Sequence, residues 1–436
     1  MYAPPAATED TGGHGFLAPL RMRGFRHLAV GQLVSSVGNA MYKVAQAWLL
    51  AATTGSNGTL IGLLAAFQLG PLLLFSGYGG WIADRWPRRR VLLTTQSTQA
   101  ALCSVLAALA FLGLVRIWEI YLVTLASGLV TVADNPARQR FLTDLVGETK
   151  LSRALGLYTA LLNIGQVLGP LVAGLIVGWA QVGWIFALDA VTFLFVVGVI
   201  LTIPAPEHTA TSAKVGGLGP GLREVRRSPE LTLTVAASAV VGSVGVQFTV
   251  TNTLMATRVF HLSATGFALL PTAVTVGCLV GALLAGQYPN PGARTVLTAA
   301  TATGLAGAAS GLAPDYPVFV LLMVPAGAAS MFFTTTAAVC LQLRSAPEVR
   351  GRVLSVQTSA FYGSGLVGAL LIGSCAGWYG PRSALLAAGL LTVALCGCLA
   401  LRYARSVRRT RAARDDTRSE AGSVDNGGVS PAAGTS

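Results

Sequence analysis

The sequence predicts an all-α membrane protein with twelve transmembrane helices in two pseudo-symmetric bundles of six. The first observation is composition: 53% of the 436 residues are hydrophobic and 11% are charged, whereas a soluble domain carries roughly 25% charged residues. The second is a series of long uncharged runs, most of them long enough for the roughly 20 residues of one membrane crossing. The third is a short repeat that relates the two halves. Together these observations exclude a water-soluble globular protein.

The predicted spans are separated by charged or polar segments, because a charge at the bilayer centre is costly. The longest uncharged runs divide at polar segments such as 53–58 and 181–183. The spans begin near Leu28, Thr59, Val91, Ile120, Ser152, Trp184, Leu231, Ala264, Arg294, Pro317, Arg352 and Ser383.

The spans group into two domains. Residues 21–203 form the first six-helix bundle, residues 230–403 form the second, and a cytoplasmic loop, 204–229, joins them. Residues 1–20 and 404–436 are rich in small, polar and charged residues, which predicts disordered cytoplasmic tails.

A repeat supports an origin of the two bundles by duplication. Arg153-Ala154-Leu155 recurs as Arg352-Val353-Leu354, and the same shift of 199 residues takes Gly169 to Gly368. The fifth and eleventh spans therefore occupy equivalent positions, as in transporters built from two parallel halves with a site between them.

The net charge of +13 predicts membrane orientation. With both termini cytoplasmic, 26 of the 30 Lys and Arg residues lie in cytoplasmic segments, Arg116, Arg258 and Arg382 lie outside, and Lys43 lies within the first span. An excess of cations in short loops marks the cytoplasmic side. We therefore expect a multi-pass protein of the cell membrane and no nucleic-acid partner. The six cysteines fall within predicted spans and the four histidines are scattered, so we expect no metal and no cofactor.

The loop between the second and third spans reads Gly-Gly-Trp-Ile-Ala-Asp-Arg-Trp-Pro-Arg-Arg-Arg over residues 79–90. It resembles the signature loop of the major facilitator superfamily, with Pro87 where the family usually has Gly. An acid among cations at a helix junction can hold two half-bundles together in one state and release them in another. The predicted switch residues are Gly80, Asp84, Arg85, Arg88 and Arg89.

The fifth span carries small residues at regular spacing around a proline. They resemble the antiporter motif of drug-exporting facilitators, with Ala173 in place of one Gly. Small residues let a neighbouring helix approach closely, and the proline permits a bend. The matching positions are Gly156, Gly165, Gly169, Pro170 and Gly174.

Three further segments, beginning at Gly31, Trp48 and Asp134, are similar to the enterobactin-exporter and macrolide-efflux branch of the superfamily. The resemblance covers residues 20–402. It implies the major facilitator fold and a monomer in the lipid bilayer that exports a small organic molecule, such as an antibiotic or siderophore, by alternating access in exchange for protons.

Polar residues follow single faces of several predicted spans. In the first span they recur at steps of three and four, which keeps them on one helical face. Such a face points either into a water-accessible cavity or into hydrogen bonds between helices. The predicted cavity residues are Gln32, Ser36, Asn39, Lys43, Gln46, Thr131, Asn163, Gln166 and Gln247.

Three charged residues inside the predicted spans are the sharpest candidates. Lys43 either binds an anionic group of the substrate or pairs with Asp189 in the sixth span. Asp134 and Asp189 are the candidates for proton coupling, although Asp134 lies one turn before Arg138 and can pair with it. Many drug exporters carry a carboxylate in the first helix, where this chain has Asn39.

Two other classes of function remain open. The same fold also performs uptake, so a nutrient importer is the alternative. A polytopic membrane enzyme would need clustered histidines and acids at one interface, and the four histidines do not cluster.

Overall fold

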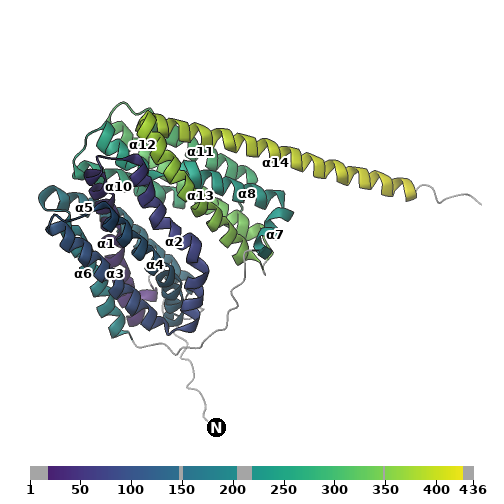
Figure 1. Cartoon of the computed structure of the whole chain (residues 1–436). Helices are drawn as coiled ribbons and strands as arrows, with labels where there is room; N and C mark the ends of the chain where they lie inside the picture. The colour runs from purple at the N-terminus through teal and green to yellow at the C-terminus, as the bar shows by residue number, and fades with distance from the viewer. Residues whose placement is uncertain (1–17, 147–150, 204–218, 347–348, 426–436) are drawn as a thin grey trace, which may run out of the picture.

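The computed structural model describes residues 18–146, 151–203, 219–346 and 349–425, and helices dominate this part of the chain (Figure 1). In chain order the helices are η1 (Ala18–Arg21), α1 (Arg23–Thr53), α2 (Gly58–Arg85), α3 (Arg88–Phe111), α4 (Ile117–Val146), α5 (Leu151–Trp179), α6 (Gly183–Thr202), α7 (Gly219–Arg227), α8 (Pro229–Val240), the π-helix η3 (Val241–Gly245), α9 (Phe248–Leu254), the π-helix η4 (Met255–Val259), α10 (Ala264–Ala285), α11 (Ala293–Gly311), α12 (Tyr316–Arg344), α13 (Arg350–Tyr379) and α14 (Pro381–Asp425).

Each of the twelve predicted segments is helical. Within the described residues, ten helical segments are long and apolar enough to cross a membrane. The seventh of the twelve combines α8, η3, α9 and η4 over Pro229–Val259. The helices α1 and α11 are not among the ten. The polar stripe of α1 lowers its mean hydropathy, and α11 is less apolar because it is rich in Ala, Gly and Thr.

The two halves use the same packing scheme. In the first half α1 packs on α5, α2 on α4, and α3 on α6. In the second half the seventh segment packs on α13, α10 on α12, and α11 on α14. The residues of the sequence repeat occupy matching places: Gly169 lies against Val37 and Ala40 of α1, and Gly368 lies against the backbone of Ser243 in the seventh segment. The repeat thus marks equivalent helix contacts in each bundle.

The bundles meet along two seams, α2 with α13 and α5 with α10. Gly58 and Gly62 of α2 lie directly against the backbone of Gly373 and Ala369, so a Cβ at either glycine would collide with a carbonyl oxygen. The seams lie toward the end where α1 and α13 finish, which we call the closed end. Toward the opposite, open end the bundles diverge (Figure 1), and the last turns of α2 expose Tyr78 at 65%.

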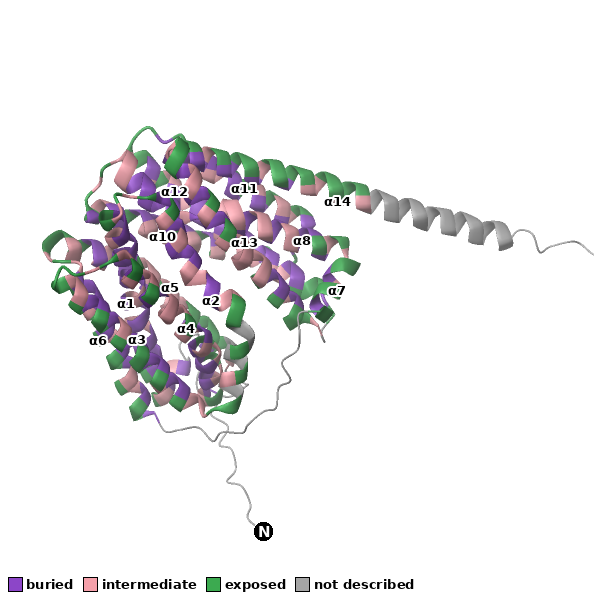
Figure 2. Cartoon of the chain, in the orientation of Figure 1, coloured by how far each residue is buried: buried purple, intermediate pink, exposed green. Residues whose placement is uncertain are grey.

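Burial follows this arrangement. Buried residues line the faces where helices meet, and exposed residues cover the outer faces (Figure 2). Large apolar side chains such as Trp179, 91% exposed, and Leu283, 75% exposed, lie on those outer faces. On a helix of a membrane span, such a face is the one that contacts lipid.

Two expectations about the segments outside the bundles need correction. The helix α14 continues to Asp425, so 404–425 is helical and not a disordered tail. This stretch is rich in Arg and Ala, which are strong helix formers. The central loop contains the helix α7 at its end. Residues 1–17, 204–218 and 426–436 lie outside the described part of the chain, so the predictions made for them stay predictions.

Candidate functional site

Three adjoining compartments lie around Lys43 of α1, whose side chain lines all three: two lie within the first bundle and one lies between the bundles. The middle compartment, of about 210 Å³, lies within the first bundle and includes Gln46 and Asp189 in its wall. The ion-pair compartment, of about 320 Å³, contains Asp134 and Arg138. The bundle-interface compartment, of about 170 Å³, is also lined by α9 and α10 of the second bundle. A ligand in contact with Lys43 can therefore touch both bundles.

The ion-pair compartment is built on a network centred on Asp134 of α4. Arg138 donates to Asp134 Oδ2 from Nη2 at 2.8 Å and from Nε at 3.0 Å, and its Nη1 donates to Gln32 Oε1 at 2.9 Å. Thr95 and Gln96 of α3 donate to the other carboxylate oxygen, Oδ1, at 2.6 and 2.8 Å. The Tyr158 hydroxyl also donates to Gln32. The pairing of Asp134 with Arg138 is confirmed, and the network ties α1, α3, α4 and α5 together.

A second network encloses Gln46, which is fully buried. Its Nε2 donates to the Tyr42 hydroxyl at 2.9 Å and to Thr124 Oγ1 at 2.6 Å. Its Oε1 accepts from Gln68 Nε2 of α2 at 3.1 Å. The polar atoms of Gln46 are therefore occupied by bonds within α1 and to α2 and α4.

Three predicted cavity residues keep their polar groups available. Asn39, Lys43 and Gln166 line the compartments, and none makes a side-chain hydrogen bond to another described residue. Ser36 and Thr131, by contrast, donate to the backbone oxygens of Leu33 and Ser127, both within hydrogen-bond distance. The first three are the side chains that can meet a ligand without breaking an existing bond.

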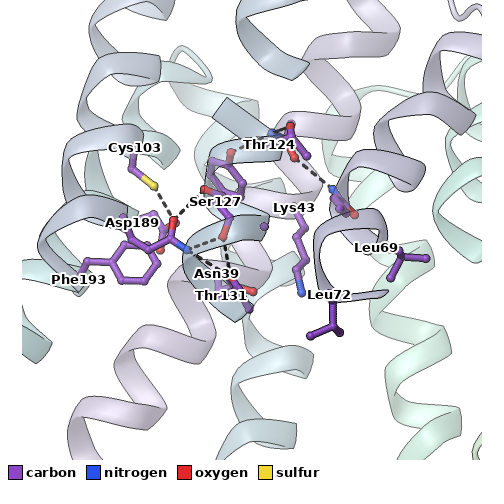
Figure 3. Close-up of a pocket in the computed structure, with 15 residues that line it drawn as sticks. Asn39, Lys43, Leu69, Leu72, Cys103, Thr124, Ser127, Thr131, Asp189 and Phe193 are labelled. Carbon is purple, nitrogen blue, oxygen red and sulfur yellow. Dashed lines mark hydrogen bonds between the residues drawn. The ribbon is translucent and has the colours of Figure 1, made fainter. Parts of the chain in front are cut away.

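Lys43 does not form the ion pair with Asp189 that the sequence left open. Within the described residues no carboxylate oxygen lies within 4.0 Å of its amino group. Its side chain extends into the middle compartment, while Asp189 lies against Cys103 on the other side (Figure 3). Asp189 Oδ2 accepts from Cys103 Sγ at 3.4 Å, and Oδ1 accepts from Thr192 at 3.1 Å.

The carboxylate of Asp189 is placed by a close approach of α1 to α6. A Cβ at Gly38 would collide with Asp189 Oδ1 and with Thr192. Asp189 is fully buried. The glycine therefore allows the carboxylate to line the same compartment as Lys43.

The bundle-interface compartment has an aromatic wall and one unsatisfied acceptor. Phe248 and Phe267 line it, and Trp48 stacks on Phe267 with ring centroids 5.7 Å apart. Asn252 is 3% exposed, and its Oδ1 has no hydrogen-bond partner among the described residues. Such an acceptor is costly unless a donor reaches it.

Two predicted cavity residues lie elsewhere. Gln247 follows a break in the seventh segment, where Val246 has φ −134° and ψ 59°, and its Nε2 donates to the carbonyl oxygens of Gly242 at 2.7 Å and Gly365 at 3.1 Å. It links the break to α13 and does not line the three compartments. Asn163 on α5 does not line them either.

The predicted switch loop acts inside the first bundle in this structure. Arg88 pairs with Asp144 at the end of α4. Arg89 donates to the backbone oxygens of Ile200 at 3.3 Å and Leu201 at 2.8 Å, at the end of α6. Arg85 lies over the Trp81 ring at 5.6 Å. Gly80 and Asp84 belong to α2, and their side-chain surroundings lie outside the described part.

The predicted antiporter motif divides between the two bundles. Gly165 and Gly169 pack against Ser36 and Ala40 of α1, whereas Gly174 packs against Ala268 of α10. Thr265 Oγ1 donates to the Gly174 oxygen at 3.0 Å. Pro170 lines the bundle-interface compartment, and Gly156 is exposed. The motif therefore joins α5 to its own bundle and to the other one.

Comparison with known proteins agrees with this arrangement. The family model of the transmembrane secretion effectors, a branch of the major facilitator superfamily, matches residues 14–423. The chain belongs to this family. It is a membrane transporter of small molecules and not an enzyme, and the resemblance seen in the sequence is confirmed.

Several curated proteins are similar over most of their length. The multidrug efflux pump Tap of Mycobacterium tuberculosis is 28% identical over 85% of this chain and 91% of its own. Macrolide efflux protein A of Streptococcus pyogenes is 24% identical over 77% of this chain and 85% of its own. The enterobactin exporter EntS of Shigella boydii is 24% identical over 88% and 94%.

Solved structures share the fold. The nucleoside transporter NupG superposes with a TM-score of 0.71 at 14% identity, covering 87% of this chain and 99% of its own. A bacterial homologue of the human lysosomal transporter Spinster superposes with a TM-score of 0.71 at 16% identity, covering 89% of this chain and 97% of its own. The all-helical membrane fold of the major facilitators is therefore confirmed.

Sequence reasoning missed Gly38, Thr95, Gln96 and Asn252. The first lies in the polar stripe of α1 but has no polar group, and its role depends on how closely α6 approaches. Thr95 and Gln96 are uncharged residues of α3, and nothing in their spacing marks Asp134 of α4 as their partner. For Asn252 the sequence did offer a signal, since it is an amide in an apolar span, five residues after the predicted cavity residue Gln247.

Proposed function

We propose that the chain exports a small amphipathic organic molecule that carries an anionic group, by alternating access of one cavity centred on Lys43. The observation that carries the proposal is a lysine inside a membrane span that lines all three compartments and has no ion pair among the described residues. A charged side chain at such depth marks a functional site by default.

The surroundings of Lys43 support an amphipathic substrate. Asn39 and Gln166 offer free polar groups near the lysine, and Asn252 Oδ1 offers an acceptor across the bundle interface. Phe248 and Phe267 supply apolar area. Binding sites for small molecules commonly combine apolar walls with a few placed polar groups. Export, and not import, is supported by the named activities of the relatives.

The proposed topology has twelve spans, with α1 and α11 included, and both termini in the cytoplasm. Arg116, Arg258 and Arg382 all lie at the closed end, in the α3–α4 loop, in η4 and at the start of α14. The other loop cations among the described residues lie at the open end. Because cations favour the cytoplasmic side, the open end faces the cytoplasm, and this structure is the inward-open state from which an exporter loads its substrate.

For coupling to protons, Asp189 is the stronger of the two candidates. Asp134 already accepts four hydrogen bonds, two of them from Arg138, with which it pairs at 2.8 Å. Asp189 lines the same compartment as Lys43 but has no ion pair among the described residues. A proton on Asp189 and an anion on Lys43 would each change the charge of one small volume, so the two events are linked electrostatically.

The test is efflux from cells that lack their own drug pumps and express the chain. Anionic, neutral and cationic amphipaths serve as the panel, with a macrolide and a catecholate siderophore included. We expect Lys43→Ala to abolish export of anionic substrates and Lys43→Arg to retain part of it. Equal export by the wild type and both variants would remove Lys43 from the mechanism.

The matched control for Lys43 is Gln46→Leu, one turn further along α1. It removes a side chain whose polar atoms already bond Tyr42, Thr124 and Gln68. We expect it to lower stability without changing the preference among the panel. For coupling, Asp189→Asn is expected to remove the dependence on the pH gradient. Retained pH-driven efflux in Asp189→Asn would contradict that assignment.

A further inference from the structure

A separate pocket of about 430 Å³ lies outside the transport cavity, between α8 and α14 at the open end. On α8 its wall is formed by Pro229, Thr232, Leu233 and Ala236, and on α14 by Leu399, Arg402, Tyr403 and Ser406. Both sets follow the spacing i, i+3, i+4, i+7, which is one face of a helix. The two helix faces therefore enclose the pocket along its length.

The pocket changes character along its length. Leu233, Ala236 and Leu399 supply the apolar part, within the apolar segments Pro229–Val259 and Pro381–Ser406. Arg226 and Arg227, at the end of α7, and Arg402 line the part nearest the open end. An apolar stem next to a cluster of cations is the pattern that an amphipathic anion requires.

These arginines are available to a ligand. Arg226, Arg227 and Arg402 are exposed, and none has an ion pair with another described residue. The nearby acid Glu230 is occupied elsewhere: it lies 3.5 Å from Arg344 and accepts from the backbone nitrogen of Ala293 at 3.0 Å. Three positive charges thus surround the pocket with no acid in its wall.

We infer that this pocket binds the phosphate headgroup of an anionic phospholipid. The lipid phosphate would lie against Arg226, Arg227 and Arg402, and an acyl chain would follow the apolar faces of α8 and α14. Basic pockets between transmembrane helices on the cytoplasmic side are suited to such headgroups. With the open end cytoplasmic, as proposed above, the lipid belongs to the cytoplasmic leaflet.

The experiment is native mass spectrometry of the full chain, purified in mild detergent and offered phosphatidylglycerol, phosphatidylcholine or glycerol phosphate. We expect the wild type to retain phosphatidylglycerol in preference to phosphatidylcholine. Each arginine near an anionic lipid contributes about fivefold in affinity, the equivalent of about 1 kcal/mol. Arg402→Gln should therefore weaken retention about fivefold, and the triple variant R226Q/R227Q/R402Q about 100-fold.

The matched control removes the same charge from the first bundle, at the same end of the molecule. R23Q/R26Q/R90Q replaces three exposed arginines that do not line the pocket, and it should retain phosphatidylglycerol as the wild type does. Equal loss in both triple variants, or no loss in either, would overturn the site. If the protein retained glycerol phosphate as strongly as phosphatidylglycerol, the pocket would be a site for a soluble anion, and the lipid assignment would be overturned.

The test does not depend on transport, so it separates this site from the proposed function. A variant that fails to fold is recognised by its elution and its helical circular dichroism. In that case Leu233→Gln, which changes only the apolar part of the pocket, provides the second measurement. The variant should weaken the binding of phosphatidylglycerol and leave the binding of glycerol phosphate unchanged. Equal binding of the lipid to Leu233→Gln and to the wild type would contradict the proposed position of the acyl chain.

Discussion

Gly174→Ala should shift the transporter away from the state seen here, because Gly174 lies in the seam between α5 and α10. A Cβ at this position would lie 2.6 Å from the Cβ of Ala268 in the other bundle. Carbon atoms in good contact are about 3.5–4.0 Å apart, so the two helices must separate by about 1 Å. Overpacking of this kind costs about 1–3 kcal/mol.

The cost falls on one state only. The seam is closed in this structure, and alternating access requires it to open in the opposite state. Ala is also a better helix former than Gly by about 1 kcal/mol, but that gain applies to α5 in both states and cancels in their ratio. A difference of about 1–3 kcal/mol corresponds to about 5- to 150-fold in the equilibrium between the two states.

The assay is labelling of a cysteine at Thr249, an exposed residue that lines the bundle-interface compartment. The six native cysteines are replaced first, and a membrane-impermeant thiol reagent is added to intact cells. If the closed end faces the outside of the cell, as we propose, Gly174→Ala should raise the labelling rate. The control is Gly377→Ala in α13, near the same end, where a Cβ would meet nothing within 4 Å. Equal rates in the two variants would refute the reasoning.

Two further outcomes follow from the hydrogen-bond networks. Asp134→Asn leaves Arg138 buried without its ion pair, so we expect the free energy of unfolding to fall by about 3–5 kcal/mol, which is measured as a lower thermal midpoint of the purified protein. A second substitution, Arg138→Gln, should restore part of this stability. An unchanged midpoint in Asp134→Asn would exclude a structural role for the pair. Gln247→Ala removes the bonds to Gly242 and Gly365, with an expected loss of about 1–3 kcal/mol. Hydrogen exchange in 241–247 should then quicken, while exchange at the same rate as in the wild type would contradict the link to α13.

Much of the fold could be predicted from the sequence because membrane burial is recorded in composition. Uncharged runs located all twelve helical segments, and the repeat placed Gly169 and Gly368 at equivalent contacts. The break at Val246–Gln247 was not predicted, since this segment contains no proline after Pro229 and its hydropathy is continuous. The helical stretch 404–425 was mistaken for a disordered tail, because polar composition outside a bilayer is shared by disordered segments and solvated helices.

The candidate site was predictable in part. The spacing of the polar stripe in α1 placed Lys43, Asn39 and Gln46 on one face, and all three line the middle compartment. Spacing could not show which of them had partners, because two of the three partners of Gln46, Gln68 and Thr124, come from α2 and α4. The same holds for Gly38, whose role is set by Asp189 on a helix distant in sequence.

In the proposed mechanism, the positions of Lys43 and Asp189 connect binding to the movement of the bundles. Asp189 is fixed to the first bundle by Gly38, Cys103 and Thr192, whereas Lys43 lines compartments within the first bundle and the compartment at the bundle interface. An anion bound at Lys43 in the bundle-interface compartment would contact α9 and α10 and so favour approach of the second bundle. A ligand can shift an equilibrium only by its differential affinity for the two states, and the bundle-interface compartment is the one of the three whose walls come from both bundles. Substrates that reach Asn252 should therefore be transported, while anions that bind only in the middle compartment should occupy the cavity and inhibit.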